Sequence, residues 1–310
     1  MQPAIEEVLA RLRWMRAERI WPNGLSYLWT GAFGVVLLVS LHRALGDVAY
    51  LSEAKALVAE VDRVLGRARG IRIGEEPDRD GQCFHDLAIW LYTLHVLGRI
   101  ELAYRQKAIG LVRAIHPRLV VPGVGVLWKM QEDLSGPFPG YGIGALDAFH
   151  GSIVYRLVDA QALASEIAAL RPLVEQSYPS LEVTQDLGLG MILWMSQFFP
   201  EEHWARTLRL RAFATLDRMW IDPPGYFSRE PRLPRVKFAF TNYGISIGLQ
   251  AVGAHPERVA KLNPFFAGYR SHDEYDRNAI THVMGCGSLF PGEFLDARAA
   301  GASSHGCAGL

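Results

Sequence analysis

Cysteine and metal-binding motifs are scarce in this sequence. Its 310 residues include only Cys83, Cys286 and Cys307, none of them in a CxxC arrangement. We therefore expect no disulfide framework, and we expect a reducing, cytoplasmic location. The ten histidines form no HExxH or HxH motif, so we expect no metal site and no cofactor.

Net charge is also lacking. The 32 Lys and Arg residues balance 32 Asp and Glu residues, with no long run of either sign, which argues against a nucleic-acid partner. Hydrophobic residues make up 50% of the chain, as in an ordered globular protein. The expected partner is a small-molecule substrate, and a homo-oligomer is left open.

A long uncharged run occurs at residues 24–41, after a basic stretch from Arg11 to Arg19. Membrane helices and buried core helices share this pattern. The run contains three glycines and follows an amphipathic segment from Ile5 to Met15. We therefore expect a core helix without stable membrane insertion, and a membrane or export segment is the alternative.

Apolar and amphipathic helical segments alternate about six times along the chain, without a convincing strand run. A simple bundle has no place for helices that are apolar on all faces, whereas an inner ring covered by an outer ring does. The pattern predicts an all-α fold, an (α/α)6 toroid formed as a single domain by residues 1–300. Residues 301–310 are expected to be a disordered tail, residues 221–235 a short hairpin, and residues 280–289 and 293–300 the sixth helix pair. A helical solenoid is the alternative.

Ionisable residues gather where the apolar helices are expected to begin. In a toroid these positions surround one end of the barrel, so their side chains converge on one cavity. Carboxylate, imidazole and phenol groups serve as general acids and bases in such a cavity, and aromatic rings form its walls. The predicted catalytic residues are Asp147, His150, Asp186 and Tyr243, and the predicted substrate-binding residues are His85, Asp86, Glu132, Asp133, Tyr141, Phe149, Tyr178, Phe227 and Phe240.

Each of these residues also has a purely structural interpretation. Asp86, Asp147 and Asp186 suit helix N-terminal caps, because a carboxylate there accepts backbone N–H bonds and meets the positive end of the helix dipole. His150 suits a satisfied core histidine, and Tyr243 suits packing. A thiol role for Cys83 or Cys286 is left open.

Four short motifs carry a family resemblance across residues 128–256. They are the acidic pair Glu132-Asp133 after Trp128, the segment from His150 to Tyr155, the Asp222-Pro223 turn with Gly225-Tyr226-Phe227, and Lys237 six residues before Tyr243. This stretch resembles the linalool dehydratase-isomerase family, cofactor-independent (α/α)6 enzymes that protonate and dehydrate small terpene alcohols.

The resemblance implies that His150 and Tyr243 lie in the active cavity. It fails at a cysteine pair that the family uses, where this chain has Ser177 and Asp186. The thiol chemistry is therefore not carried over, and Asp186 is a candidate replacement acid.

The leading hypothesis is a cofactor-independent lyase or isomerase, of dehydratase or cyclase type, acting on a small apolar or isoprenoid-like substrate. Asp186 or Asp147 would donate the proton, His150 would bind or deprotonate the hydroxyl, and Tyr243 would assist. One alternative is a carbohydrate-processing enzyme, a glycoside hydrolase or epimerase, because (α/α)6 rings commonly host these activities. The other is a non-catalytic helical binding protein.

Overall fold

The computed structural model describes residues 2–23 and 26–296, which fall into two compact units. We call residues 24–181 the continuous unit, and residues 1–23 together with 182–310 the split unit. The predicted tail, Cys307 and the first two residues of the uncharged run, Gly24 and Leu25, lie outside the described residues. That residues 1–300 form a single domain stays a prediction.

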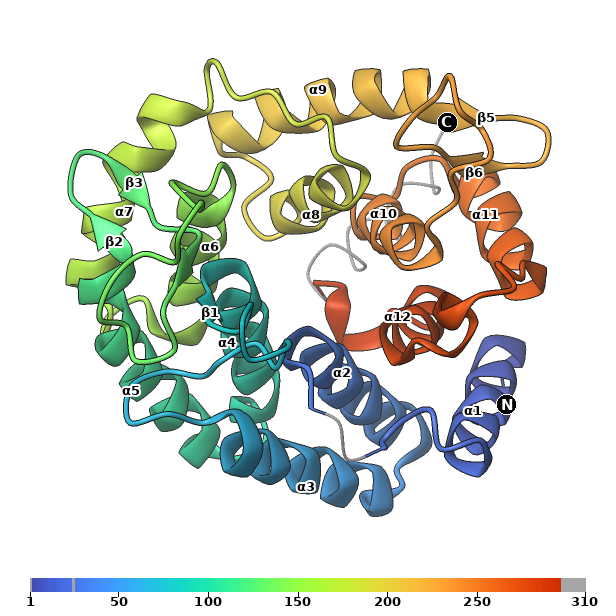
Figure 1. Ribbon diagram of the computed structural model, residues 1–310, viewed down its shortest axis with the longest axis horizontal. Coiled ribbons are helices and arrows are strands. Elements are labelled where there is room, and N and C mark those ends of the chain that lie inside the picture. The colour runs from blue at the N-terminus through green and yellow to red at the C-terminus, as the bar shows by residue number, and fades with distance from the viewer. Residues whose placement is uncertain (1, 24–25, 297–310) are drawn as a thin grey trace, which may run out of the picture. The chain divides into compact units, whose positions relative to one another are not determined.

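The continuous unit consists of three helix pairs. These are α2 (Leu28–Leu45) with α3 (Val48–Leu65), α4 (Phe84–Gly98) with α5 (Leu102–Leu119), and α6 (Asp147–Asp159) with α7 (Ala164–Ser177). Within this unit α3, α5 and α7 lie along one side of the row formed by α2, α4 and α6 (Figure 1). The first helix of each pair is therefore the more deeply buried one.

Burial follows the sequence pattern closely in the first pair. Every residue of α2 from Leu28 to Leu41 is buried, whereas α3 buries a single stripe of Leu51, Ala54, Val58, Val61 and Leu65. The spacing of three and four residues places this stripe on one helix face. Asp47 begins α3 as its N-cap and accepts a hydrogen bond from the Ala49 N–H at 2.8 Å.

Among the described residues, α2 is long and apolar enough to cross a membrane by length and composition, and 78% of that stretch is buried within the protein. The core helix of a globular protein meets the same two criteria. The burial of α2 therefore accounts for its hydropathy through packing.

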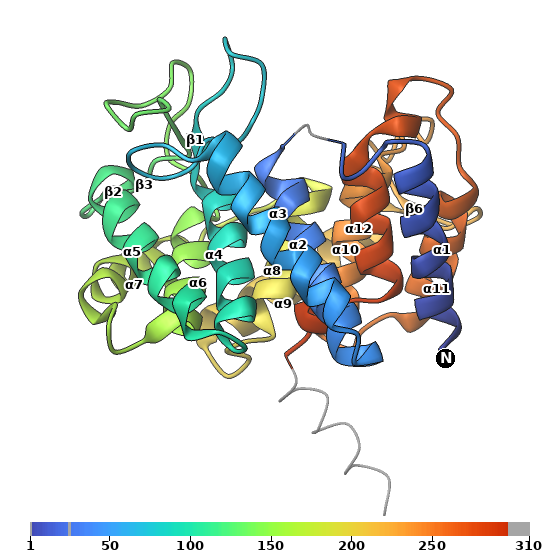
Figure 2. The ribbon, with the colours of Figure 1, turned by 90° about the horizontal axis from the view of Figure 1, so that it is seen from below.

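The described residues of the split unit also form three pairs. The apolar helices α8 (Asp186–Ser196), α10 (Ala239–Ala251) and α12 (Ala279–Leu289) pack with α9 (His203–Met219), α11 (Pro256–Gly268) and α1 (Pro3–Ala17), respectively. Figure 2 shows α1 beside α12, so the first helix of the chain completes the last pair.

The predicted second helix of that last pair, residues 293–300, is wrong. Residues Gly292–Phe294 form a short 3₁₀ turn, η2, and residues 297–300 lie outside the described part of the chain. Gly292 has a positive φ of 50°, which does not continue an α-helix. A second 3₁₀ turn, η1 (Glu274–Arg277), precedes α12.

Glycines bring α8 and α10 into backbone contact. A Cβ atom on Gly190 would lie 2.6 Å from backbone atoms of Gly244, and one on Gly248 would lie 2.3 Å from the Gly190 carbonyl oxygen. No larger residue fits between the two backbones at this separation. The pair is therefore closed to any ligand along this contact.

Within residues 2–23 and 26–296, three two-residue antiparallel strand pairs join the helices. The hairpin β2 (Val120–Val121) with β3 (Gly125–Val126) follows α5, and β5 (Trp220–Ile221) with β6 (Tyr226–Phe227) follows α9 and confirms the predicted hairpin. The third pair joins β1 (Gln82–Cys83) to β4 (Lys129–Met130), far apart in sequence. It anchors the start of α4 beside the loop that precedes α6.

Candidate active site

His85 is held between two partners at the start of α4. The Phe84 N–H donates to the Trp128 carbonyl at 2.9 Å, which extends the β1–β4 pairing and sets His85 next to Trp128. The Trp128 indole N–H donates to Nδ1 of His85 at 2.9 Å, and Nε2 of His85 lies 3.0 Å from Oδ2 of Asp86. In the neutral form of the ring, this pair of contacts places the proton on Nε2 and leaves the lone pair on Nδ1.

Asp86 shifts the protonation of His85 strongly. Burial lowers the pKa of His85, but the charge of the Asp86 carboxylate and its hydrogen bond more than offset burial and raise the pKa to about 9. The imidazolium keeps its hydrogen bond to Asp86. It cannot accept the hydrogen bond from the Trp128 N–H, because its Nδ1 then carries a proton. Protonation therefore turns Nδ1 into a free donor.

Asp147 and His150 form a second imidazole–carboxylate pair on the first turn of α6. Oδ1 of Asp147 lies 3.6 Å from Nδ1 of His150, and both side chains are buried, with exposed fractions of 4% and 6%. Gly144 makes room for the carboxylate, since a Cβ atom there would lie 1.8 Å from Oδ2 of Asp147. Neither nitrogen of His150 has a hydrogen-bond partner among the residues described.

Several buried polar atoms on α4 and α6 share this lack of a partner. Within residues 2–23 and 26–296 they include Oδ1 of Asp86, Nε1 of Trp90, Oδ2 of Asp147 and both ring nitrogens of His150. Helices α4 and α6 are packed neighbours, and the charge of Asp147 reaches far enough to raise the pKa of His85. Buried polar groups in proteins are nearly always hydrogen-bonded, so a group of exceptions indicates a ligand site.

The acidic pair of the central loop is engaged in loop structure. Glu132 accepts two hydrogen bonds from Arg67, at 2.6 and 2.8 Å, and Asp133 accepts one from the Ser135 N–H at 2.9 Å. Both acids lie at the surface, where such pairs contribute little to stability. The structure does not bring them to the unpartnered atoms.

The predicted aromatic residues of the continuous unit are spread over different places. Tyr141 is 37% exposed and packs edge-on against Trp128, with ring centroids 5.1 Å apart. Phe149 is buried in α6, and Tyr178 follows the last residue of α7. Tyr141 adjoins the His85 pair through its contact with Trp128.

Asp186 is fully satisfied in the split unit. Its Oδ2 accepts from the Thr241 hydroxyl at 2.7 Å, and its Oδ1 accepts from the Leu187 N–H at 2.9 Å and from Nη2 of Arg229 at 3.2 Å. All three partners present a donor to the carboxylate, and the Thr241 hydroxyl shares its single proton between Asp186 and the Phe238 carbonyl at 3.0 Å. The structural interpretation as a helix-start anchor therefore fits Asp186.

The other predicted residues of the split unit separate into two groups. Phe227 is fully buried, and the side-chain amide of Asn242 bonds both its N–H and its carbonyl, at 2.7 and 2.9 Å. Phe240 and Tyr243 line a cavity of about 570 Å³ that is also lined by α1 and the loop before α12. Tyr243 is buried and takes a hydrogen bond from Arg11.

The two described cysteines are buried and free. Burial raises the pKa of Cys83 well above its ordinary value and raises that of Cys286 to about 12. Both groups therefore stay thiols at neutral pH, whereas a nucleophile requires the thiolate. No group of three or more His, Cys, Asp or Glu side chains within the described part of the chain is arranged to hold a metal ion.

Sequence reasoning placed Trp128 among the aromatic residues of the cavity wall, and it did not single out Trp29 or Trp90. The Trp29 ring lies 6.0 Å from that of His85, and Trp90 lies one helical turn beyond Asp86. The spacing of Asp86 and Trp90, four residues apart in one helix, was the available signal, because it places them on one face.

No family model matches this chain, and no curated protein matches it significantly. Two solved structures are similar to it. One is a D-mannose isomerase, with a TM-score of 0.62, 11% sequence identity and 86% of each chain covered. The other is the cellobiose 2-epimerase of Bacillus thermoamylovorans B4167, with a TM-score of 0.55, 11% identity, and 83% of this chain and 74% of that chain covered.

These similarities confirm the predicted fold class: the chain has the (α/α)6 barrel fold. At 11% identity they establish the fold alone. Neither of the two similar structures is a linalool dehydratase-isomerase, so the resemblance to that family stays a prediction.

The leading functional hypothesis, a lyase or isomerase acting on a small apolar substrate, is wrong as a lyase on an apolar substrate. The similar structures are a sugar isomerase and a sugar epimerase, which favours the carbohydrate alternative. The chemistry of α4 and α6 gives the physical reason. Their unpartnered donors and acceptors are more numerous than the single hydroxyl of a small terpene alcohol can bond, whereas a sugar carries several hydroxyl groups.

Proposed function

We propose that this protein is a carbohydrate isomerase or epimerase that works by acid–base proton transfer. The observation that carries the proposal is His150, a buried imidazole without a partner for either nitrogen among the described residues. A sugar hydroxyl and an adjacent C–H group would give these nitrogens the contacts that they lack. The fold shared with a D-mannose isomerase and a cellobiose 2-epimerase supports the same class.

Interconversion of an aldose and a ketose moves one hydrogen from C2 to C1 and one proton from the C2 hydroxyl to the C1 oxygen. A base takes the C2 proton, an enediol forms, and the proton returns to C1. Epimerisation at C2 returns the proton to C2 from the opposite face. Atoms and electrons balance in both reactions, so neither needs an oxidant or a reductant.

His150 suits the base in this scheme. Its imidazolium would be stabilised by Asp147, whose Oδ1 lies 3.6 Å from Nδ1. His85 suits the acid, because its pKa of about 9 leaves it protonated at neutral pH. Its charge would stabilise the oxygen on which negative charge develops.

The test is deuterium exchange into D-mannose, D-fructose, D-glucose and cellobiose in D₂O, followed by proton NMR. We expect one of these sugars to acquire deuterium at C1 or C2. His150→Gln should lower that rate by roughly 10² to 10⁴-fold, the usual contribution of a general base. The matched control is His42→Gln, on a histidine near the end of α2 that bonds the Asp47 carbonyl.

Two outcomes would contradict the proposal. One is an unchanged exchange rate in a folded His150→Gln variant. The other is the absence of exchange into every sugar by the folded wild-type protein. Hydrolysis of cellobiose without exchange would instead favour a glycoside hydrolase, with Asp86 and Asp147 as the two carboxylates.

A further inference from the structure

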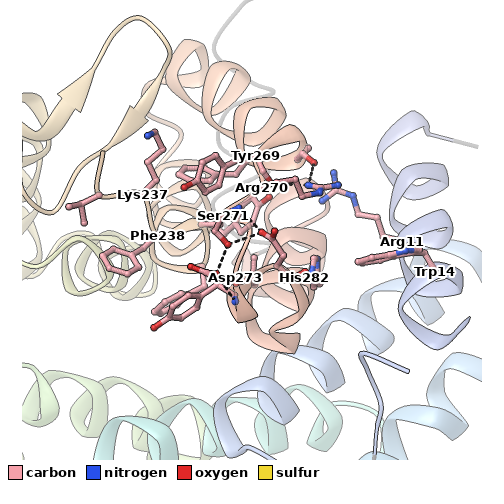
Figure 3. A pocket seen from close by; sticks show the side chains of 18 of the residues that line it. Arg11, Trp14, Lys237, Phe238, Tyr269, Arg270, Ser271, Asp273 and His282 are labelled. Atoms are coloured by element: carbon pink, nitrogen blue, oxygen red, sulfur yellow. Dashed lines mark hydrogen bonds between the residues drawn. The ribbon is translucent and has the colours of Figure 1, made fainter. Parts of the chain in front are cut away.

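A cavity of about 570 Å³ lies within the split unit, and none of the residues assigned to proton transfer lines it. It is lined by α1, the loop before α10, the end of α11 and the loop before α12. Figure 3 shows Tyr269, Arg270 and Ser271 in its middle, with Lys237 and Phe238 on one side and Arg11 on the other. Its volume is that of a typical site for a small molecule.

The acidic residues that line this cavity are already engaged. Glu7 accepts from Nε of Arg11 at 2.8 Å. Asp276 accepts from the N–H and the hydroxyl of Ser271, at 2.7 and 2.8 Å, and Asp273 accepts from the same hydroxyl at 2.6 Å. Within the described part of the chain, none of these carboxylates forms an ion pair with Arg235, Lys237 or Arg270.

Three lining cations have donors left over. Arg235 has no acceptor in the described part of the chain, and Lys237 Nζ lies 5.7 and 5.6 Å from the ring centroids of Tyr226 and Tyr269. Arg270 uses only Nη1, which donates to two carbonyls at the end of α11. Its Nε and Nη2 have no protein acceptor within residues 2–23 and 26–296. Guanidinium and ammonium donors with no carboxylate partner are suited to an oxyanion.

Two titratable groups in the cavity respond to this positive charge. Burial lowers the pKa of His282, and the charges of Arg11 and Arg270 lower it further, against a hydrogen bond to the Asp276 carbonyl that raises it. Burial raises the pKa of Tyr243, while Arg11 and Arg270 act to lower it. Burial is the larger cause for both groups, and the contribution of Arg11 and Arg270 is in the direction that favours negative charge in the cavity.

An aromatic stack stands beside these cations. The Phe265 ring is stacked between Tyr226 and Tyr269, with centroids 5.1 and 5.9 Å away. This stack fixes the Tyr269 ring at the cavity wall, and Phe238 and Phe240 add further apolar surface. A ligand here would meet cations and aromatic rings together.

We propose that this cavity binds a small organic anion, whose carboxylate or phosphate is held by Arg235, Lys237 and Arg270 and whose carbon skeleton lies against Phe238 and Tyr269. The inference does not rest on the proposed isomerisation. It follows from the unpartnered cations, the engaged acids and the aromatic wall of one unit.

Calorimetric titration of the full chain tests the inference. The probes are D-glucuronate, D-glucose 6-phosphate and inorganic phosphate, with D-glucose as the uncharged control. We expect a charged sugar to bind saturably, D-glucose to bind at least tenfold more weakly, and the affinity to fall as salt rises from about 50 mM to about 500 mM. Preference for glucuronate or for glucose 6-phosphate identifies the oxyanion, and either preference supports the inference.

Matched variants assign the binding to the cavity. Lys237→Gln and Arg235→Gln should each weaken binding about tenfold, the usual effect of losing a hydrogen bond to a charged group. Arg232→Gln, on an exposed arginine of the same loop that does not line the cavity, should leave affinity unchanged. Arg270→Gln is less suitable alone, because Arg270 also bonds the end of α11.

Three results would overturn the inference. The first is equal affinity for glucose and its charged relatives. The second is a folded Lys237→Gln, Arg235→Gln double variant that binds as tightly as the wild type. The third is the absence of saturable binding by all three anions to the folded wild-type protein.

Discussion

The pair α8–α10 and the pair α4–α6 are both built from apolar helices, but they differ in what they leave unfilled. Glycines bring the backbones of α8 and α10 into contact, and the buried Asp186 at the start of α8 has a partner for each oxygen. Between α4 and α6, oxygens of Asp86 and Asp147 and both nitrogens of His150 have none among the described residues. The contact between α8 and α10 is therefore purely structural. Helices α4 and α6 instead carry buried polar atoms without hydrogen-bond partners, as expected of a ligand-binding site.

The largest expected effect tests the closed pair. Gly190→Ala should lower the free energy of unfolding by about 2 to 3 kcal/mol, because its Cβ would lie 2.6 Å from the Gly244 backbone and force the two helices apart. Urea denaturation measures the change.

Gly110→Ala on α5 is the matched control for this variant. A Cβ atom there meets nothing within 4 Å, so the higher helix propensity of alanine should stabilise the protein, by about 0.5 to 1 kcal/mol. Equal effects of the two substitutions would show that α8 and α10 do not pack as closely as described.

A smaller difference in unfolding free energy is expected between substitutions of Asp186 and Asp147, which each stand first in an apolar helix. Asp186→Asn should cost about 1 to 2 kcal/mol of unfolding free energy, a value reduced because the Arg229 side chain is 41% exposed. Asp147→Asn should change it by less than about 0.5 kcal/mol, since Oδ2 of Asp147 has no partner to lose among the described residues.

Chemical denaturation of both variants at one pH gives the comparison. A stability loss of similar size in Asp147→Asn would mean that Asp147 is a structural cap, as one sequence interpretation held. The distinction between the two helix pairs would then lose its main support.

The helical repeat was largely readable from the sequence. Alternation of apolar and one-sided helices identified the pairs from α2 through α11, because periodicity reports how many faces of a helix are buried. The sixth pair was misassigned, because α1 covers α12 from the opposite end of the chain. Local periodicity carries no information about which distant helix supplies the cover.

The sequence identified the types of residue at the candidate site, but it did not distinguish which of them are catalytic and which are structural. Asp147 and Asp186 each stand first in an apolar helix, and sequence treats them alike. What distinguishes them is Arg229 and Thr241, which lie 43 and 55 residues beyond Asp186 and pack against it only in the folded chain. The cations of the split-unit cavity were missed for the same reason, because α1 and the loops before α10 and α12 meet only in the fold.

The last comparison concerns the pH dependence at the start of α4. The folded-state pKa of His85 is raised to about 9 from an ordinary 6.5, so the folded state binds this proton more tightly than the unfolded state. The resulting stabilisation is complete below about pH 6.5, falls as pH rises toward about 9, and is absent above that. Asp86→Asn should remove this dependence and bring the pKa back toward or below 6.5.

Trp128→Phe should act in the opposite direction. The Trp128 N–H donates to a lone pair that only the neutral His85 ring has, so its loss should raise the pKa above about 9. NMR titration of the His85 ring protons follows both variants, and unfolding free energies at about pH 6 and about pH 9.5 check the linkage. An unaltered titration in Asp86→Asn would show that Asp86 does not hold the charge of His85, and the contrast with the fully partnered Asp186 would then rest on Asp147 and His150 alone.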